Sequence, residues 1–429
     1  MVRARRAARR LPAAPRTRRI CRARRVADVG TAVRGARMCG IGGVFSTDEL
    51  PDVLLARMQD GLRHRGPDGE GRWRDPCGTA GLVHARLAII DLTDGGAQPM
   101  RSADGRYVLV FNGEIYNYRA LRAELEAGGA RFSTESDTEV LLTLAAAHGI
   151  EGLRRLRGMF ALALWDTHAR RGLLARDGFG IKPLYYANTA SGLLFASELR
   201  TLLATGAVDF RLDPVALGDF FATGSVPEPA SLVEGVAVLP PGHTLSWEGG
   251  RATLERFWSV HFPPPTVSAR SEAICLTRAA LEDSITAHFV SDVPVGLFLS
   301  GGIDSTALLS LAARAGHASG MDTFSIAVDQ ASHDEAGVAA ASARRFGSRH
   351  HVLRLDGGSA ADSLDSFLDS MDVPSVDGFN TWTVSRFARS QGMKVVLSGL
   401  GGDEMFGGYP SFRNVPRLRA LVSAARRLP

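Results

Sequence analysis

Two apolar segments that each run straight into a glycine loop limit most strongly what this 429-residue chain can fold into. The first reads VPVGLFL and enters SGGIDS at 300–305, and the second reads VVL and enters SGLGGDE at 398–404. Helix-like stretches at 307–315 and 336–346 flank a further strand pattern at 323–328. Strands that alternate with helices predict a doubly wound parallel sheet, which binds ligands at the carboxyl ends of its strands. Both glycine loops lie at such ends.

The glycine loop at 300–305 has the chemistry of a phosphate site. Glycines let backbone N–H groups close around phosphate oxygens, and the N-terminus of the following helix adds the positive end of its dipole. The spacing differs from GxxxxGK[ST], which excludes a Walker-type loop. The alternative is a plain turn between strand and helix. For Asp403 and Glu404 the alternative is a pair of acids that complement the dipole of the next helix.

Residues 39–225 show a different pattern, in which short apolar strands alternate with few helices. Apolar positions with a 3.6-residue period predict helices at 118–127 and 138–148. Proline-rich stretches between residues 226 and 265 mark turns and a linker. The predicted strands are 81–84, 87–91, 107–112, 160–166, 172–176 and 193–197.

Cys39 follows Met38 and opens the segment MCGIGGVF, where its position indicates a chemical use. If Met38 is removed, the thiol of Cys39 is a nucleophile at the first residue of the chain. Its own α-amine, with a pKa of about 7.7 to 8.0, can then act as the base without a separate histidine. The alternative is a small apolar cysteine in a glycine-rich buried strand.

Six segments in order along the chain resemble the glutamine-hydrolysing asparagine synthetases, whose front half is a class II, N-terminal-nucleophile glutaminase. They are MCGIGGVF (38–45), RHRGPDG (63–69), HARLAIIDL (84–92), FNGEIYNY (111–118), ESDTEV (135–140) and RDGFGIKPLYY (176–186). SGGIDS is similar to the PP-loop of ATP pyrophosphatases, which hold the departing pyrophosphate while AMP is transferred to a carboxylate.

The resemblance implies both a fold and a division of the chain. The implied fold is an α+β N-terminal-nucleophile hydrolase sandwich of four layers, followed by an α/β doubly wound parallel-sheet PP-loop domain. The implied parts are an arginine-rich leader at 1–38, a class II glutaminase domain at 39–225, a linker with connecting strands at 226–270 and an asparagine synthetase domain at 271–429.

The glutamine site is expected from the chemistry of amide hydrolysis together with the resemblance. The developing oxyanion needs hydrogen-bond donors, and Asn112 with Gly113 matches that role. Arg86 offers a bidentate guanidinium to the substrate α-carboxylate, and Asp137, with Glu114 nearby, offers a carboxylate to its ammonium group. The alternatives are a hairpin turn for the Asn–Gly pair, a surface position for the arginine and an N-cap or turn for the aspartate.

The PP-loop resemblance implies ATP as a substrate and Mg²⁺ as a cofactor at the second site. Magnesium needs few protein carboxylates because it shares its shell with phosphates, and Asp304 and Asp403 are expected to hold it with pyrophosphate. The residues expected to bind ATP are Leu299, Ser300, Gly301, Gly302, Asp304, Ser305, Ile326, Ser398 and Gly399.

Charge, hydropathy and cysteine usage argue against several other classes of protein. The chain carries +5 overall, but residues 1–38 hold 13 arginines and one acid and so carry +12, which leaves −7 for 39–429. An acidic body argues against nucleic acid as a partner, and no apolar run approaches the ~18 residues that cross a bilayer. The four cysteines lie far apart without a CxxC pair, which fits the cytoplasm rather than a disulfide framework or zinc site.

The arginine-rich segment 1–38 lacks the apolar core of a secretory signal. We expect translation to begin at Met38, so that Cys39 becomes the first residue of the working protein. A processed propeptide is the second interpretation. A basic arm that makes the protein a nucleic-acid-binding module is the third.

The implied reaction is glutamine-dependent asparagine synthesis. Cys39 hydrolyses the side-chain amide of glutamine, ammonia passes internally, and ATP converts aspartate into β-aspartyl-AMP. Ammonia then gives asparagine, AMP and pyrophosphate. The expected partners are therefore the small molecules glutamine, aspartate and ATP, with no nucleic acid or membrane, and a homodimer is a further expectation.

The sequence departs from the family in several places. It ends soon after Tyr409, inside the synthetase domain, so we expect a C-terminally incomplete chain without a family lysine that steadies the acyl-adenylate chemistry. SGLG stands where many members read SGEG, and the segment expected near the acceptor reads DGFN at 377–380. The alternatives are therefore an amidotransferase that acts on a peptide or sugar precursor, and a fragment with glutaminase activity alone.

Overall fold

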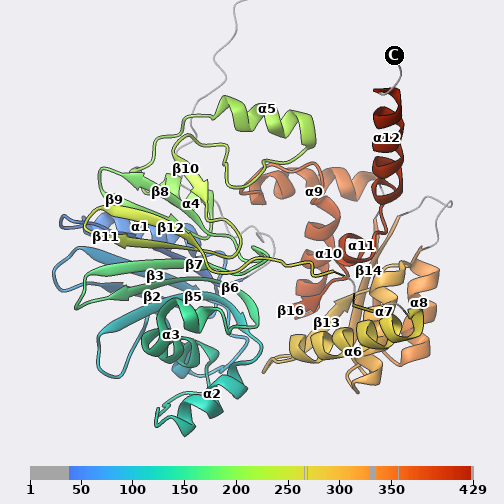
Figure 1. Ribbon diagram of the computed structural model, residues 1–429, viewed down its shortest axis with the longest axis horizontal. Helices are drawn as coiled ribbons and strands as arrows, with labels where there is room; N and C mark the ends of the chain where they lie inside the picture. Colours follow the sequence, from blue (N-terminus) through green and yellow to red (C-terminus); the bar gives the residue numbers. More distant parts are fainter. Residues whose placement is uncertain (1–37, 265, 268, 329–334, 356, 427–429) are drawn as a thin grey trace, which may run out of the picture. The chain divides into compact units, whose positions relative to one another are not determined.

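The computed structural model describes residues 38–264, 266–267, 269–328, 335–355 and 357–426, which all belong to one unit of the chain. The expected leader, apart from Met38, lies outside the described residues. The described part contains two six-stranded antiparallel sheets and one four-stranded parallel sheet (Figure 1). Within these residues, no helix has the length and apolar character that crossing a membrane requires.

The first antiparallel sheet has the strand order β10-β8-β9-β1-β3-β2, and β1 is buried along its whole length. Close packing explains a glycine in β1, because a Cβ atom on Gly43 would lie 2.4 Å from the carbonyl oxygen of Gly81. Its strands are β1 (Gly40–Phe45), β2 (Gly69–Arg74), β3 (Ala80–Arg86), β8 (Tyr185–Thr189), β9 (Gly192–Ala196) and β10 (Val236–Val238).

The second antiparallel sheet has the order β12-β11-β7-β6-β5-β4. Its longest pairing is between β5 and β6, which stay in register from Tyr107 opposite Asp166 to Ile115 opposite Gly158. Its strands are β4 (Met100–Arg101), β5 (Tyr107–Ile115), β6 (Gly158–Asp166), β7 (Arg171–Arg176), β11 (His243–Glu248) and β12 (Arg251–Arg256).

The apolar side chains of these sheets form three cores, which set the layer order. The central core lies between the sheets, where the ring of Phe45 stacks on Trp165 with centroids 5.2 Å apart. The outer face of the first sheet packs against α1 (Asp52–Leu62) and α4 (Leu199–Ala204). The outer face of the second packs against α2 (Tyr118–Ala127) and α3 (Asp137–Leu153). This helix–sheet–sheet–helix arrangement confirms the four-layer sandwich.

Most of the predicted elements in this half are confirmed. Both predicted helices form, and five of the six predicted strands lie in β3, β5, β6, β7 and β9. The segment 226–270 supplies β10 to the first sheet and β11 and β12 to the second. A short helix, α5 (Pro214–Thr223), precedes it, capped by the side chain of Asp213.

The strand predicted at 87–91 is wrong, because this segment is a loop. Side chains and not a neighbouring strand accept its backbone N–H groups: Ala88 donates to Asp68 and Asp91 donates to Asp292. Asp91 also has a φ of 52°, a left-handed conformation that no regular strand accommodates. Alternating apolar residues therefore reflect burial here and not a ladder of hydrogen bonds.

The parallel sheet has the order β15-β14-β13-β16, and each neighbouring pair is parallel. Its strands are β13 (Val295–Phe298), β14 (Asp322–Val328), β15 (Arg349–Leu355) and β16 (Val395–Leu397). The accompanying helices are α6 (Arg270–His288), α7 (Ile303–Arg314), α8 (Glu335–Phe346), α9 (Gly357–Ser370), α10 (Phe379–Ser390), α11 (Gly402–Phe406) and α12 (Ser411–Ala425).

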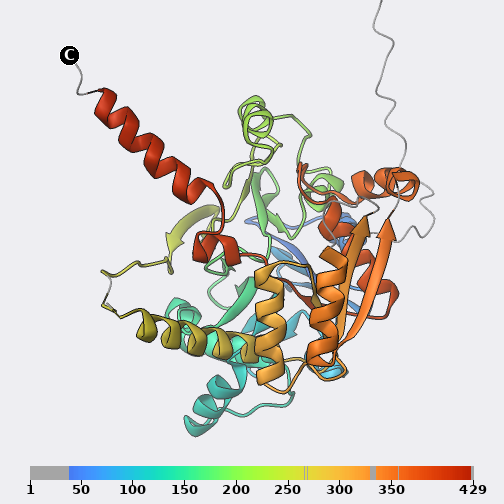
Figure 2. The same ribbon diagram turned by 90° about the vertical axis from the view of Figure 1, so that its right-hand side faces the viewer.

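Helices cover both faces of this sheet. On one face, α6, α7 and α8 enclose a core around Leu297 and Leu309 (Figure 2). On the other face, Phe387 of α10 packs edge-on against Phe324 of β14, with centroids 5.8 Å apart. The doubly wound parallel sheet that the two glycine loops predict is thereby confirmed, and both loops lie at the carboxyl ends of adjacent strands.

Candidate active site

Cys39 immediately precedes β1 in the sequence. Its side chain lines a cavity of about 500 Å³. Its thiol lies against Leu87, whose carbonyl oxygen is 3.4 Å and whose N–H donor is 3.3 Å from Sγ. Burial raises the pKa of this thiol, while the Leu87 N–H group and the cations Lys182 and Arg65 oppose that rise. The position differs from that of an inert cysteine inside a strand, because the thiol faces a space that a ligand can enter.

Asn112 and Gly113 lie inside β5, opposite Ala161 and Phe160 of β6. The hairpin alternative for this pair is therefore wrong. The side chain of Asn112 is 1% exposed, and its Nδ2 atom has no hydrogen-bond partner among the described residues. A buried amide donor without a partner, in the same cavity as a nucleophilic thiol, is available to an oxyanion.

Gly113 is fixed by close contact with the neighbouring strand. A Cβ atom at this position would lie 2.1 Å from the carbonyl oxygen of Met159, which is backbone and cannot yield. Only glycine therefore fits, and it lines the cavity beside Asn112.

Arg86 lies at the end of β3 and is 9% exposed, so the surface alternative for it is wrong. Its Nη1 donates to the carbonyl oxygen of Thr93 at 2.7 Å, and its Nη2 donates to that of Asp91. These bonds hold the loop that follows β3 against the cavity. A guanidinium has five N–H donors, so donors remain for a ligand carboxylate.

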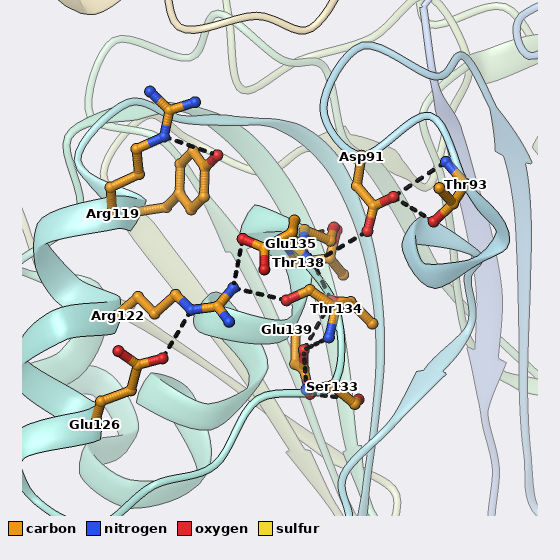
Figure 3. A network of polar contacts seen from close by, with 12 residues as sticks. Asp91, Thr93, Arg119, Arg122, Glu126, Ser133, Thr134, Glu135, Thr138 and Glu139 are labelled. Atoms are coloured by element: carbon orange, nitrogen blue, oxygen red, sulfur yellow. Dashed lines mark hydrogen bonds and ion pairs between the residues drawn. The ribbon is translucent and has the colours of Figure 1, made fainter.

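A polar network joins the loop that follows β3 to the loop that precedes α3 (Figure 3). The carboxylate of Asp91 accepts hydrogen bonds from the hydroxyl and N–H groups of Thr93 and from the N–H group of Glu135. Burial opposes ionisation of Asp91, but these bonds prevail and lower its pKa. Arg122 also donates to the carbonyl oxygen of Thr134 at 2.7 Å. The hydrogen bond from Glu135 to Asp91 thus connects the loop that follows β3 to the loop that precedes α3.

Asp137 begins α3 and points back toward β5. The cap itself is Ser136, whose hydroxyl accepts from Thr138 N at 3.1 Å, so the capping alternative applies to Ser136 and not to Asp137. One carboxylate oxygen of Asp137 accepts from Ile115 N at 3.0 Å. Burial, together with the nearby Glu114, raises the pKa of Asp137 to about 7, although the hydrogen bond from Ile115 opposes this rise.

Glu114 lies beside Asp137 in the same cavity, and burial raises its pKa as well. Lys182 opposes that rise. Two buried carboxyl groups with few protein donors attract a cationic ligand group, because such a group would satisfy both. The geometry thus brings together the residues predicted for glutamine: Cys39, Arg86, Asn112, Gly113, Glu114 and Asp137 all line one cavity.

Sequence reasoning missed residues that support this cavity. Arg65 donates from Nε to the carbonyl oxygen of Cys39 at 2.9 Å and from Nη1 to Glu198 at 2.8 Å. Gln98 joins β5 to α3, because its amide oxygen accepts from Phe111 N at 2.6 Å and its amide nitrogen donates to the hydroxyl of Thr138 at 3.2 Å. Arg65 stands in the turn-rich segment RHRGPDG, where two basic residues beside a predicted site were a usable signal.

Lys182 was also missed. It lies in the segment RDGFGIKPLYY, and it and Lys394 are the two lysines of a chain with 48 arginines. Both line the cavity that contains Cys39. The rarity of lysine in this sequence was the signal that could have drawn attention to these two residues.

A second cleft, of about 600 Å³, lies at the carboxyl ends of β13 and β16. The SGGIDS loop is held in shape by its own hydroxyls, since Ser300 Oγ and Ser305 Oγ are 3.0 Å apart and Gly302 N donates to Ser300 at 3.1 Å. The second loop approaches closely: a Cβ atom on Gly402 would lie 2.3 Å from Oδ2 of Asp304. The predicted residues that line this cleft are Ser300, Gly302, Asp304, Ser305, Ser398, Gly399 and Asp403.

Three predicted ATP residues do not line this cleft. The side chain of Leu299 is 1% exposed and packs in the core beneath the sheet, and its N–H group donates to Phe324 O at 2.8 Å. Gly301 faces Glu335, and Ile326 is half-buried within β14. The lining of this cleft therefore gives no support to the prediction that these three residues bind ATP.

The two predicted metal ligands, Asp304 and Asp403, share this cleft. In the described part of the chain, no cluster of three or more His, Cys, Asp or Glu side chains could hold a metal ion by itself. A pair of carboxylates in a glycine-lined cleft fits Mg²⁺, which takes one or two protein carboxylates and completes its shell with phosphate oxygens and water. Asp403 and Glu404 also occupy the first turn of α11, where the helix-dipole alternative places them.

The two cavities meet at one side chain. Phe298, at the end of β13, lines both the cavity around Cys39 and the cleft at the glycine loops. Val395 and Val396 of β16 and Ala388 of α10 continue the wall of the Cys39 cavity toward the parallel sheet. The walls of the two cavities therefore join at Phe298.

Comparison with known proteins agrees with this division into two sites. Residues 38–258 match the glutamine amidotransferase domain family, and residues 276–428 match the asparagine synthase family. Asparagine synthetase [glutamine-hydrolyzing] 1 of Bacillus subtilis is 37% identical over 384 residues, which cover 88% of this chain and 60% of that protein.

Two further relatives show the range of the similarity. A putative asparagine synthetase [glutamine-hydrolyzing] of Mycobacterium tuberculosis is 40% identical over 385 residues, covering 85% of this chain and 58% of that protein. Amidase chry2 of Gibberella zeae is 31% identical over 379 residues, which cover 84% of this chain and 56% of that protein. The chain thus spans about three fifths of the length of the curated relatives that it matches.

Proposed function

Because the chain belongs to the glutamine amidotransferases that carry an asparagine synthase domain, we propose that it transfers the side-chain nitrogen of glutamine to a carboxylate at the expense of ATP. The observation that carries this proposal is the pair of cavities that meet at Phe298, one with the thiol of Cys39 and one with the SGGIDS loop. Each cavity supplies the chemistry that the other lacks.

The first half-reaction is the hydrolysis of glutamine. The thiol proton of Cys39 passes to the α-amine, and the sulfur attacks the side-chain carbonyl carbon. The oxyanion of the tetrahedral adduct receives hydrogen bonds from Asn112 Nδ2 and the backbone at Gly113, ammonia leaves with the transferred proton, and water then hydrolyses the glutamyl thioester to glutamate. The unpartnered Nδ2 atom supports this role for Asn112.

The same cavity supports recognition of an amino acid. The guanidinium of Arg86 binds the α-carboxylate of glutamine, and Asp137 with Glu114 binds its ammonium group. The bound ammonium would lower the pKa of Asp137 and keep this carboxylate ionised. The support is the shared cavity and the burial of both acids.

This mechanism requires that Cys39 become the first residue. In the chain described here Met38 is attached to it, and Met38 N donates to Arg65 O at 3.1 Å inside the same region. We infer that the Met38–Cys39 bond is cleaved before glutamine reacts, since an α-nitrogen within a peptide bond cannot accept the thiol proton. The mass of the purified protein tests this directly.

The second half-reaction takes place at the glycine loops. The substrate carboxylate attacks the α-phosphorus of ATP and pyrophosphate leaves. Ammonia then attacks the acyl-adenylate, which gives the amide and AMP. The first turn of α7, where Ile303, Asp304 and Ser305 line the cleft, holds the pyrophosphate with its N–H groups. Asp304 and Asp403 would hold Mg²⁺, which neutralises phosphate charge when bound.

Aspartate is the first candidate acceptor, and asparagine is then the product. The similarity to asparagine synthetases supports it. The second candidate is another carboxylate, in a peptide or a sugar precursor, and the similarity to amidases favours keeping it. An acceptor screen with AMP release as the readout separates the two.

The test of the whole proposal uses the full chain with glutamine, ATP, Mg²⁺ and aspartate. We expect asparagine and AMP to appear together. A Cys39→Ala variant should lose the reaction with glutamine and keep it with free ammonium, because only the nitrogen source is removed. No AMP with any acceptor, from either nitrogen source, would contradict ligation and leave glutaminase activity alone.

A further inference from the structure

The two lysines of the chain stand in one cavity. The sequence has 48 arginines beside its two lysines, and Lys182 and Lys394 both line the space around Cys39. Lysine differs from arginine in carrying a compact charge whose pKa shifts readily on burial. The chain therefore places its two small, titratable cations beside the nucleophile.

Lys182 is held in place by its backbone. It lies in the loop between β7 and β8, where its N–H group donates to Asp177 at 3.0 Å and its carbonyl oxygen accepts from Arg176 Nε at 2.8 Å. Asp177 also accepts from the N–H groups of Phe179 and Ile181, each at 3.0 Å. The loop is thus rigid, and the position of the lysine side chain follows from it.

The ammonium group of Lys182 is buried without a contacting carboxylate. The residue is 8% exposed, and within the described residues no carboxylate oxygen lies within 4.0 Å of Nζ. Its polar contact is the sulfur of Met38, 3.6 Å away, on the residue next to Cys39. By contrast, Lys394 forms an ion pair with Asp68 at 2.7 Å. An unpaired buried charge destabilises a fold, so stability does not explain Lys182.

Of the two cations that act on Cys39, Lys182 has no ion pair among the described residues. Arg65 also lies against Cys39, but its guanidinium forms an ion pair with Glu198 at 2.8 Å. The acidic side chains whose charge acts on Lys182 are Glu114 and Asp177, and Asp137 acts on Cys39 itself. Among the described residues, no oxygen of these carboxyl groups lies within 4.0 Å of the ammonium of Lys182.

We propose that Lys182 is a positioning residue that stabilises the thiolate of Cys39. This inference rests on the proposed function only in taking Cys39 as the nucleophile. In a buried site a nearby positive charge favours the anion of a thiol far more than it does in water. Burial lowers the pKa of Lys182 itself, although Glu114 opposes this, so the effect fades when the lysine loses its proton at alkaline pH.

The test measures the chemistry of the thiol and not turnover. Alkylation of Cys39 by iodoacetamide is followed against pH in the full chain, with the mass of the Cys39 peptide as the readout. The variants are Lys182→Met, which removes the charge, Lys182→Gln as a second neutral side chain, and Lys182→Arg, which restores it. Lys394→Met is the matched control, because it removes the other lysine of the cavity.

The expected result is a rise of about one pH unit in the alkylation midpoint for both neutral variants, which is about tenfold in thiolate fraction. Lys182→Arg should recover most of this shift, and Lys394→Met should show none. Equal midpoints in the parent and both neutral variants would overturn the proposal. So would equal shifts in the arginine and neutral variants, which would indicate packing and not charge.

The outcome is separable from that of the proposed function. If the parent protein does not hydrolyse glutamine, the function fails, yet the alkylation midpoints still decide whether Lys182 acts on the thiol. If glutamine is hydrolysed and the midpoints do not move, only the role of Lys182 fails.

Discussion

Lys394 and Asp68 form an ion pair, 2.7 Å between Nζ and Oδ2, that joins the parallel-sheet half to the sandwich at the wall of the Cys39 cavity. The same carboxylate oxygen accepts from Ala88 N at 2.9 Å, and Lys394 also donates to Ala88 O at 3.4 Å. The loop that precedes β2, the loop that follows β3 and the start of β16 therefore meet at one carboxylate.

Lys394→Met should let ammonia escape from the cavity without unfolding the protein. The two side chains are 37% and 28% exposed, so the pair contributes at most about 1 kcal/mol to stability. We expect more glutamate per AMP than in the parent, measured in the same reaction. Arg349→Met, which removes an exposed ion pair with Asp322 elsewhere, should leave that ratio unchanged. An unchanged ratio in the Lys394 variant would mean that this contact does not seal the cavity.

Asn112→Ala should reduce kcat for glutamine hydrolysis by about 10²- to 10³-fold with little change in KM, since the amide acts only on the oxyanion. The buried Nδ2 atom has no other partner to lose, so the effect on stability should be small. The control is Asn117→Ala, because the Asn117 amide binds the backbone at Arg155 and Arg157 instead. A rise in KM with unchanged kcat would place Asn112 in substrate binding.

Protonation of Asp137 should lower kcat/KM for glutamine hydrolysis at acidic pH. Its pKa in the empty cavity is raised from 3.8 to about 7, so below that pH it is neutral and cannot pair with the ammonium of glutamine. kcat/KM should therefore fall about tenfold per pH unit below pH 7. Asp137→Asn should make the decline below pH 7 shallower and leave the part that comes from protonation of the α-amine of Cys39. Asp60→Asn, on an exposed carboxylate of α1, should leave the profile unchanged.

The same raised pKa has a consequence for stability. The folded state holds the proton of Asp137 more tightly than the unfolded chain, so this group contributes stability below about pH 3.8 that is lost as the pH rises through 7. Thermal unfolding at pH 8 should consequently occur at a higher temperature in Asp137→Asn than in the parent. A lower temperature would contradict the burial of an unpaired carboxylate.

Phe298→Trp should separate the two half-reactions. The larger ring adds volume where the two cavities meet, at a cost of about 1–3 kcal/mol if the wall does not relax. Glutamine hydrolysis and the reaction with free ammonium should continue, while the amide formed from glutamine should decline. Equal loss of all three activities would show that the substitution disturbs the fold.

The sequence predicted the fold well where apolar periodicity and backbone hydrogen bonding agree. The glycine loops after β13 and β16 are examples, because a strand, a tight turn and a helix each leave a local pattern. It failed at 87–91, where the apolar pattern reflects burial but side chains from Asp68 and Asp292 take the backbone N–H groups. Those partners lie 20 and 201 residues away and leave no local signal.

In the site, too, local motifs could be predicted from the sequence, whereas contacts between distant loops could not. Each residue predicted for glutamine lines one cavity, and each stands in one of the motifs on which the family resemblance depends. The supporting contacts of Arg65 and Lys182 depend on how distant loops pack and could not be derived from spacing. At the second site, Leu299 stands in the motif, yet its side chain belongs to the core.

The proposed function requires that nitrogen released at Cys39 reach the ATP site inside the protein. The direct measurement uses glutamine with ¹⁵N in its side-chain amide, together with ATP, Mg²⁺, aspartate and an excess of unlabelled ammonium, and follows ¹⁵N in the newly formed amide. Internal transfer should leave most of the label in the product, and AMP should form in an amount equal to that of the amide. An amide diluted to the isotope ratio of the solution, or no AMP-linked amide at all, would contradict it.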